Sequence, residues 1–293
     1  MSKHAYLIIA HSNVGLLNQL LSVLDDDHND IFLHIDKKAD AKFISSIHQN
    51  LLKSRLYFSK RVTVHWGGYS QILSELELLK AATKRGHYDY YHLLSGVDLP
   101  IKSQDYIHQF FDLNQGKEFV QFQKPVIAKQ KLERLRRYYM FQEHDIRNSP
   151  ILSLTQRATV KLQRIAHLDR IHKSHITFQM GSNWFSITDQ LARYVLSQAP
   201  HYLPLFKYSQ CADELFLQTV VANSSFLSNV FDQHFNDSEV GNMRFIKWVN
   251  HAPRIITSED FPALKSSSLL FARKFDPIRD QKIIDQVVAE LAI

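Results

Sequence analysis

Three short segments place acidic, aromatic and glycine residues directly after apolar runs. His34-Ile35-Asp36 ends one run with a carboxylate, which in nucleotide-binding α/β sheets accepts hydrogen bonds from ribose hydroxyls or a base N–H. Trp66-Gly67-Gly68-Tyr69-Ser70 combines two of the eight glycines with aromatic rings that suit stacking on a base or sugar. Asp98, at the turn of residues 95–100, could bind a sugar hydroxyl or a metal. Read alone, these segments also fit a helix cap, a core aromatic and an ordinary turn.

A carboxylate and a pair of cations in the last third of the chain could carry out a group transfer. Glu214 lies near an expected helix start, where a carboxylate can take a proton from an attacking hydroxyl. Arg273 and Lys274 follow an apolar run and could offset charge that develops on a leaving phosphate. The alternatives are an acid that stabilises a helix N-terminus and a solvated surface cation.

The sequence does not favour metal ligation. Asp25-Asp26-Asp27 has the acid-x-acid pattern of metal-dependent enzymes, but it precedes a strand, so we expect a solvated loop. The sixteen histidines include no His-Glu-x-x-His, and His167, His172 and His175 lie in a basic stretch that repels a cation. The single cysteine, Cys211, excludes a disulfide framework and a thiolate zinc cluster, and we expect it to be buried. No metal and no cofactor are therefore expected.

Alternating strand and helix patterns must position these side chains. The first half predicts strands at 6–10, 31–35, 62–66, 88–94 and 119–122, and helices at 14–24, 41–52, 70–82 and 103–111. The last third predicts strands at 184–187 and 243–248, and helices at 189–197 and 213–223. Such alternation predicts an α/β fold, a parallel sheet between two helical layers, with ligands at the carboxyl ends of the strands.

Length and composition indicate one globular domain. The chain has 293 residues, of which 45% are hydrophobic, with eight glycines and eight prolines, which excludes a disordered or collagen-like protein. We divide the domain into a Rossmann-like nucleotide-binding half at 1–125, a basic helical insertion at 126–178 and an acceptor and catalytic half at 179–293. The apolar run at 5–10 is far shorter than the ~20 residues that cross a bilayer. A soluble, cytoplasmic protein is expected.

The positive charge is concentrated in residues 129–173. This segment holds eleven lysines and arginines against four acids, a net of +7, whereas the whole chain carries +6. Residues 155–175 alternate apolar and basic side chains, as in an amphipathic surface helix. Docking to anionic membrane lipids, binding of an acidic acceptor and a solvated helix all fit. A nucleic-acid-binding protein is the alternative of another class, but the segment has no recognised nucleic-acid motif, so no nucleic-acid partner is expected.

Seven motifs in order resemble the core 2/I-branching β-1,6-N-acetylglucosaminyltransferases and their relatives, the peptide O-xylosyltransferases. They lie at 5–11, 34–36, 66–70, 94–101, 181–185, 213–219 and 270–276. The resemblance implies a GT-A-like three-layer α/β/α sandwich, a UDP-sugar donor, inversion at the anomeric carbon and no metal requirement. The function it implies is transfer of a sugar, N-acetylglucosamine first, to a hydroxyl of a glycan or lipid-linked acceptor. UDP-xylose and UDP-galactose are the alternative donors.

The resemblance also implies roles for individual residues. Glu214 matches the catalytic base, and Lys274 matches a basic residue that meets the donor diphosphate. Asp36 matches a uridine contact. The other expected donor-side residues are His11, Trp66, Asp98, Arg254 and Arg273. The expected acceptor-side residues are Lys131, Arg134 and Trp184, the last of which equally fits the core. Peripheral contact with the inner face of the plasma membrane is expected to involve the basic segment 129–173.

Overall fold

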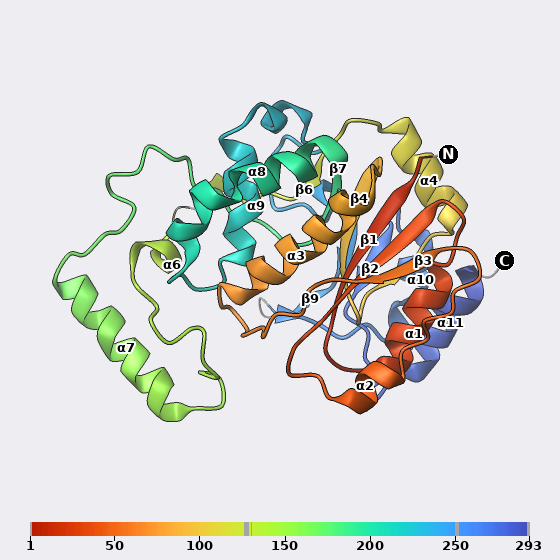
Figure 1. The fold of residues 1–293 in the computed structure, drawn as a ribbon, viewed down its shortest axis with the longest axis horizontal. Helices are drawn as coiled ribbons and strands as arrows, with labels where there is room; N and C mark the ends of the chain where they lie inside the picture. The colour runs from red at the N-terminus through yellow and green to blue at the C-terminus, as the bar shows by residue number, and fades with distance from the viewer. Residues whose placement is uncertain (1, 126–128, 130, 250–251, 292–293) are drawn as a thin grey trace.

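The computed structural model describes residues 2–125, 129, 131–249 and 252–291. Its centre is a six-stranded sheet of order β3-β2-β1-β4-β7-β6 between helical layers (Figure 1). The strands are β1 (His4–Ala10), β2 (Asn29–Ile35), β3 (Arg55–Phe58), β4 (Tyr90–Ser95), β6 (Phe119–Val120) and β7 (Phe185–Thr188). The predicted α/β sandwich is confirmed. The sheet is parallel through β3, β2, β1 and β4, whereas β7 and β6 run antiparallel to their neighbours, so it is mixed.

The alternation of side chains along β1 explains the two helical layers. Ala5 and Leu7 face one core, and Tyr6 and Ile8 face the other, because successive strand residues point to opposite faces. The first core is covered by α3 (Ser70–Arg85), α8 (Asp189–Phe206) and α9 (Asp213–Ala222). The second is covered by α1 (Val14–Val23), α4 (Gln104–Leu113), α10 (Phe261–Ser266) and α11 (Gln281–Leu291).

The strand predicted at 62–66 is wrong, and the helix predicted at 41–52 is too long. The third parallel strand is β3, and α2 (Ala41–Ser45) spans only five residues. Residues 61–64 instead hold the end of β2 in place. The Val62 amide donates to the His34 ring at 2.9 Å, and the Arg61 guanidinium donates to backbone carbonyl oxygens that include those of Ile35 and Asp36. These side-chain contacts replace a strand ladder.

Among its described residues, the basic insertion is helical over shorter stretches than predicted. It forms α6 (Glu133–Arg136) and α7 (Pro150–Ile165), joined by turns. Helix α7 starts at Ser149, whose hydroxyl accepts from the Leu152 amide, and it stops at Ile165 because His167 adopts a left-handed φ of 52°. The helix predicted at 155–175 is therefore displaced towards the N-terminus. Ile171 lies outside the helix and packs into the core.

A second, three-stranded sheet brings the C-terminal segment to the main sheet. It has the order β5-β11-β8, from β5 (Leu99–Pro100), β11 (Phe271–Arg273) and β8 (Arg244–Ile246). Phe271 pairs with Pro100, and Ala272 pairs with Leu99. The Phe275 amide donates to the Val97 carbonyl at 3.0 Å. Residues 273 and 274 therefore lie beside the loop that follows β4. A short hairpin of β9 (Trp248–Val249) and β10 (Ala252–Pro253) follows β8.

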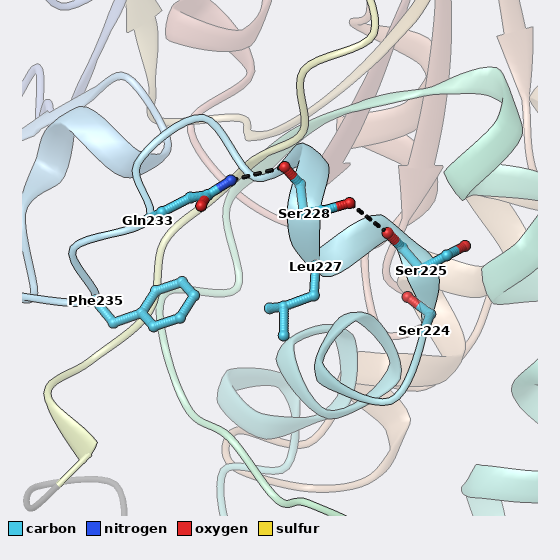
Figure 2. Close-up of a pocket in the computed structure, with 6 residues that line it drawn as sticks. All are labelled: Ser224, Ser225, Leu227, Ser228, Gln233 and Phe235. Atoms are coloured by element: carbon cyan, nitrogen blue, oxygen red, sulfur yellow. Dashed lines mark hydrogen bonds between the residues drawn. The ribbon is translucent and has the colours of Figure 1, made fainter.

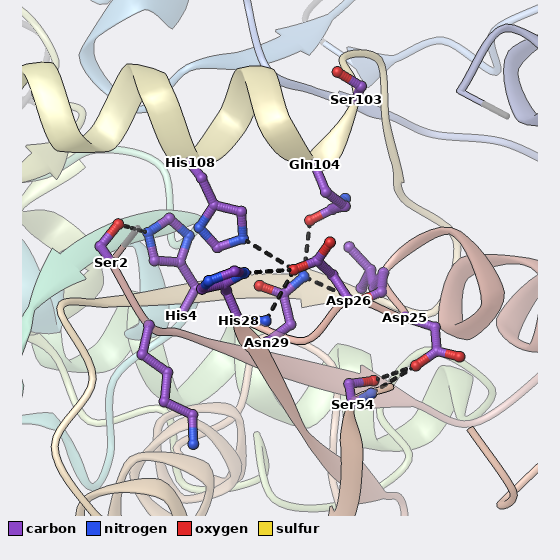
Figure 3. Close-up of polar contacts among 12 residues, drawn as sticks. Ser2, His4, Asp25, Asp26, His28, Asn29, Ser54, Ser103, Gln104 and His108 are labelled. Atoms are coloured by element: carbon purple, nitrogen blue, oxygen red, sulfur yellow. Dashed lines mark hydrogen bonds and ion pairs between the residues drawn. The ribbon is translucent and has the colours of Figure 1, made fainter. Parts of the chain in front are cut away.

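The amino-terminal edge of the main sheet holds a buried histidine cluster (Figure 3). The rings of His4 and His108 lie 4.1 Å apart, and burial lowers the pKa of both. The Asp25 carboxylate accepts the backbone amides of residues 52–54. The Asp26 carboxylate accepts from the His28 amide at 2.9 Å. The acidic segment is a loop, as predicted, but Asp25 and Asp26 are partly buried and anchor this edge instead of being fully solvated.

Candidate active site

The carboxyl ends of β1, β2 and β4 converge at one edge of the sheet. The Asp36 amide donates to the Ala10 carbonyl at 3.0 Å, which joins the ends of β1 and β2. The buried Asp36 carboxylate accepts from the Lys38 amide at 2.9 Å and lies 3.7 Å from the Lys38 ammonium. The Lys38 ammonium also donates to the Val64 carbonyl at 2.6 Å, so the segment that leads to Trp66 is held against Asp36.

His11 and Lys274 lie close enough to this edge to share its electrostatics. His11 follows β1 directly, and its side chain is partly exposed. Partial burial lowers the pKa of His11, the Asp36 carboxylate opposes that change, and the charges of Lys38 and Lys274 lower it further. The charges of Asp36 and Lys274, two predicted donor-side residues, therefore act on His11, as does that of Lys38, which the sequence did not single out.

Asp98, Arg273 and Trp184 form a layered contact behind this edge. The buried Asp98 carboxylate accepts from the Ser95 amide at 2.8 Å and from the Ser95 hydroxyl at 2.7 Å. The Nε atom of Arg273 lies 3.3 Å from an Asp98 oxygen, and the guanidinium lies over the Trp184 ring, 4.0 Å from its centroid. Asp98 thus orients Arg273. Trp184 is buried and lies on Arg273, the cation predicted for the donor side.

Arg254 belongs to the strand-like segment that runs beside Lys274. The Ile256 amide donates to the Lys274 carbonyl at 2.9 Å, and the Arg254 amide donates to the Lys247 carbonyl at 2.6 Å. The Arg254 guanidinium lies 3.9 Å from the exposed Glu259 carboxylate. Lys274 itself is exposed. Arg254 therefore lies two residues before Ile256, the residue whose backbone is bonded to that of Lys274.

Side chains of the basic insertion contact the loop that carries Trp66, Gly67 and Gly68. The Arg147 guanidinium lies 3.3 Å from the centroid of the half-exposed Trp66 ring. The Trp66 carbonyl accepts from the Gln142 side chain at 3.0 Å. Gly67 has a left-handed φ of 69°, which favours glycine, and a Cβ on Gly68 would lie 2.4 Å from a Glu143 oxygen, so the Glu143 side chain would have to move. These insertion contacts had no signal in the sequence.

The Glu214 carboxylate forms an ion pair with Arg134 of the basic insertion. Glu214 occupies the first turn of α9, and Arg134 occupies α6. The guanidinium donates to the Glu214 carboxylate at 2.5 Å, with 39% of the Glu214 side chain exposed. Burial opposes the charge of Arg134, but the Glu214 carboxylate raises the pKa of Arg134 overall. Lys131 instead donates to the Gln123 side chain at 3.2 Å, so only Arg134 of the predicted basic pair contacts Glu214.

Two buried acids behind Glu214 were missed by the sequence analysis. The Asp213 carboxylate accepts from the Gln71 side chain at 2.8 Å, and burial and the Glu214 charge raise the pKa of Asp213 to about 7. Burial and the Asp213 charge raise the pKa of Glu75 well above its usual range. Glu75 lies three residues after buried Ile72 on α3. An acid on an apolar helix face was the signal that could have identified it.

Residues 181–184 connect Glu214 with Arg273. The Gly181 amide donates to the Glu214 carbonyl at 2.9 Å, and Trp184, three residues on, contacts Arg273. A Cβ on Gly181 would lie 1.8 Å from the Gln121 carbonyl oxygen, which no side chain tolerates. Residues 181–184, which are tightly packed, therefore contact both Glu214 and Arg273.

Replacing Gly181 with alanine is expected to lower the free energy of unfolding by about 1–3 kcal/mol, because the new methyl group must displace backbone. Urea denaturation measures this loss. Gly15→Ala is the matched control, since nothing lies within 4 Å of its Cβ and the residue is inside α1. That variant is expected to be unchanged or slightly more stable. Equal stability of Gly181→Ala and the wild type would contradict the close contact.

A shallow hollow away from this edge does not suit a charged ligand. It has a volume of about 540 Å³ and is lined by Ser224, Ser225, Leu227, Ser228, Gln233 and Phe235 (Figure 2). None of these side chains is charged, so the hollow offers no cation to a phosphate. Within the described ranges of the chain, no three His, Cys, Asp or Glu side chains are grouped to hold a metal ion. No helix there is long and apolar enough to span a membrane.

Comparison with known proteins shows the family of this chain. The chain belongs to the Core-2/I-Branching enzyme family, whose model matches residues 4–265. This confirms the family that the sequence motifs indicated. Xylosyltransferase oxt of Drosophila melanogaster is 25% identical over 92% of this chain, and xylosyltransferase 1 of Homo sapiens is 23% identical over 97%.

These relatives are longer proteins. The alignments cover 31% of the Drosophila protein and 30% of the human one, so the chain spans about a third of the length of the curated relatives it matches. Solved structures with some similarity are core-mannan synthase A of Aspergillus fumigatus and mouse xyloside xylosyltransferase 1. The first has a TM-score of 0.39 at 12% identity, over 76% of this chain and 71% of its own. The second has a TM-score of 0.37 at 11% identity, over 76% of this chain and 83% of its own.

Proposed function

We propose that the protein transfers a sugar from a UDP-sugar to an acceptor hydroxyl with inversion at the anomeric carbon. The observation that carries this proposal is the placement of a partly exposed carboxylate, Glu214, and of the cations Arg273 and Lys274 on elements joined by residues 181–184. A base for the acceptor and positive charge for the leaving group are the two requirements of such a transfer.

Glu214 is the proposed general base. As the acceptor oxygen attacks the anomeric carbon, Glu214 takes the hydroxyl proton, the new carbon–oxygen bond forms, and the bond from that carbon to the UDP oxygen breaks. Attack from the face opposite UDP inverts the anomeric configuration. Arg134, at 2.5 Å from the Glu214 carboxylate, orients it. Lys131, beyond Arg134, is the proposed further contact with the acceptor.

Lys274 and Arg273 are the proposed partners of the UDP diphosphate. Lys274 is exposed, and Arg273 is fixed between the Asp98 carboxylate and the Trp184 ring. Fixed positive charges stabilise the leaving group without reorganising during the reaction. The Asp98 oxygens are engaged by Ser95 and Arg273, so Asp98 acts through Arg273. Arg254, beside Lys274 along the backbone, is the proposed second contact with the diphosphate. We therefore propose a metal-independent reaction.

Asp36 and Trp66 are the proposed contacts of the nucleoside. Asp36 lies at the carboxyl end of β2, where ligands of parallel sheets bind, with His11 beside it. The Trp66 ring and the Arg147 guanidinium stacked on it are the planar groups proposed to lie against the base. N-acetylglucosamine is the proposed sugar and a glycan or lipid-linked hydroxyl the proposed acceptor. UDP-xylose is the second candidate donor, because the relatives above are named xylosyltransferases.

Calorimetric titration with UDP tests the donor class. Binding in EDTA, unchanged when manganese replaces EDTA, is the expected result, because protein cations bind the diphosphate. Binding that needs manganese would contradict the roles of Lys274 and Arg273. No binding of UDP under either condition would contradict the donor class itself. A positive result is followed by assays of transfer and hydrolysis with UDP-N-acetylglucosamine, UDP-xylose and UDP-galactose.

A further inference from the structure

Helix α7 carries an exposed apolar stripe. Ile151, Leu154, Leu162 and Ile165 are 77%, 69%, 64% and 66% exposed. At 3.6 residues per turn these four side chains and Ala158 fall within an arc of about 80° around the helix axis. Val160 is buried on the opposite face of the helix and does not belong to the stripe.

The opposite face of α7 is fixed to the rest of the insertion by two glutamines. Gln156 accepts from the Phe141 amide at 3.0 Å and donates to the Gln142 side chain at 2.9 Å. Gln163 accepts from the Tyr138 amide at 2.7 Å and donates to the Tyr138 carbonyl at 2.9 Å. These bonds set the rotation of the helix and turn the stripe outward. Figure 1 shows α7 at the edge of the molecule, apart from the central sheet.

Basic side chains line one side of the stripe. Arg157, Lys161 and Arg164 are exposed and lie about 60–120° from the stripe's centre on the same side of the helix. The sixteen residues of α7 include no acid. An apolar stripe edged by cations is the pattern of a helix that lies in a membrane interface, with aliphatic groups among the acyl chains and cations at anionic headgroups.

We propose that α7 docks the protein on a lipid bilayer that carries anionic headgroups, with its stripe lying in the interface. The charges favour a bilayer over a second copy of this chain. An antiparallel two-fold pairing of the stripes would align the three cations of each copy along one edge, where they repel. This inference goes beyond the proposed function and does not depend on the identity of the sugar.

The docked helix would be linked to both sides of the candidate active site. Arg147, three residues before α7, lies on Trp66, and Arg134, in α6, pairs with Glu214. Glu133, beside Arg134, lies 3.6 Å from Arg164 of α7. The insertion therefore places a membrane-facing helix and two site-facing arginines on one segment, as an acceptor at a membrane surface would require.

Vesicle sedimentation tests the docking. The probes are vesicles of phosphatidylcholine alone and of phosphatidylcholine with phosphatidylglycerol, at two salt concentrations. We expect binding to the anionic vesicles that weakens with salt. Replacing Ile151, Leu154, Leu162 and Ile165 with serine is expected to weaken it about tenfold or more, because the aliphatic groups no longer enter the interface. Arg157→Gln with Lys161→Gln is expected to remove most of the preference for the anionic vesicles.

Leu52→Ser with Leu113→Ser is the matched control, since those leucines are 94% and 79% exposed and lie outside α7. That variant is expected to bind vesicles as the wild type does. Thermal unfolding by circular dichroism verifies that each variant folds. Equal sedimentation with and without vesicles would overturn the proposal. So would a concentration-dependent dimer in analytical ultracentrifugation that the serine variant abolishes.

Discussion

Replacing Glu214 with glutamine is expected to lower the rate of sugar transfer by about 10²–10⁴, the range that loss of a general base produces. Glutamine keeps the size of the side chain and its hydrogen bond to Arg134, but it cannot take the acceptor proton. Binding of UDP is expected to stay within a few-fold of the wild type, because Glu214 is proposed to act on the acceptor and not on UDP. Steady-state transfer kinetics and calorimetry measure the two effects separately.

Glu133→Gln is the matched control for that variant. Glu133 lies on α6 beside Arg134, its side chain is 36% exposed, and it forms ion pairs with arginines of the insertion, such as Arg136 and Arg164. Its removal changes local charge by the same amount without touching Glu214. We expect its transfer rate to remain close to that of the wild type. Near-normal turnover of Glu214→Gln would mean that the base is elsewhere, with the buried Asp213 next in line.

Local patterns were sufficient to predict the layers and the strand ends of this fold. The apolar run of β1 arises because both of its faces are buried, and the helical spacing of α1 and α3 arises because each packs one face into a core. The same patterns placed Asp36 and Asp98 at strand ends, because those positions follow apolar runs. The strand predicted at 62–66 was wrong although these residues have the composition of a strand. The segment is held instead by side chains: the His34 ring accepts from the Val62 amide, and Arg61 donates to the Ile35 carbonyl.

Contacts between distant segments could not be predicted from the sequence. Arg134 meets Glu214 across eighty residues, and Arg147 meets Trp66 across eighty-one, with no periodic signal at either end. Arg273 reaches Asp98 only because β11 pairs with β5. The family motifs indicated which residues share a site, but they did not indicate that Asp98 supports Arg273 or that Trp184 lies under the same cation.

Lys274→Ala is expected to weaken UDP binding by about ten- to a hundredfold, the effect of losing one charge-assisted hydrogen bond to a phosphate. Uridine has no phosphate, so its affinity is expected to change by less than about twofold. The difference between the two ligands isolates the diphosphate from the Asp36 end of the site. Calorimetry with both ligands measures it, and Lys274→Arg, which keeps the charge, is expected to retain most of the UDP affinity.

Lys282→Ala is the control for charge alone, because this exposed lysine lies on α11. A long-range effect of net charge would weaken UDP binding in both variants and would disappear at high salt. The loss of a direct contact would weaken binding only in Lys274→Ala and would remain at high salt. Equal losses for UDP and uridine in Lys274→Ala would remove this lysine from the diphosphate site. Arg273, held by Asp98 and Trp184, would then be the main cation that meets the leaving group, and Arg273→Gln should show the selective loss instead.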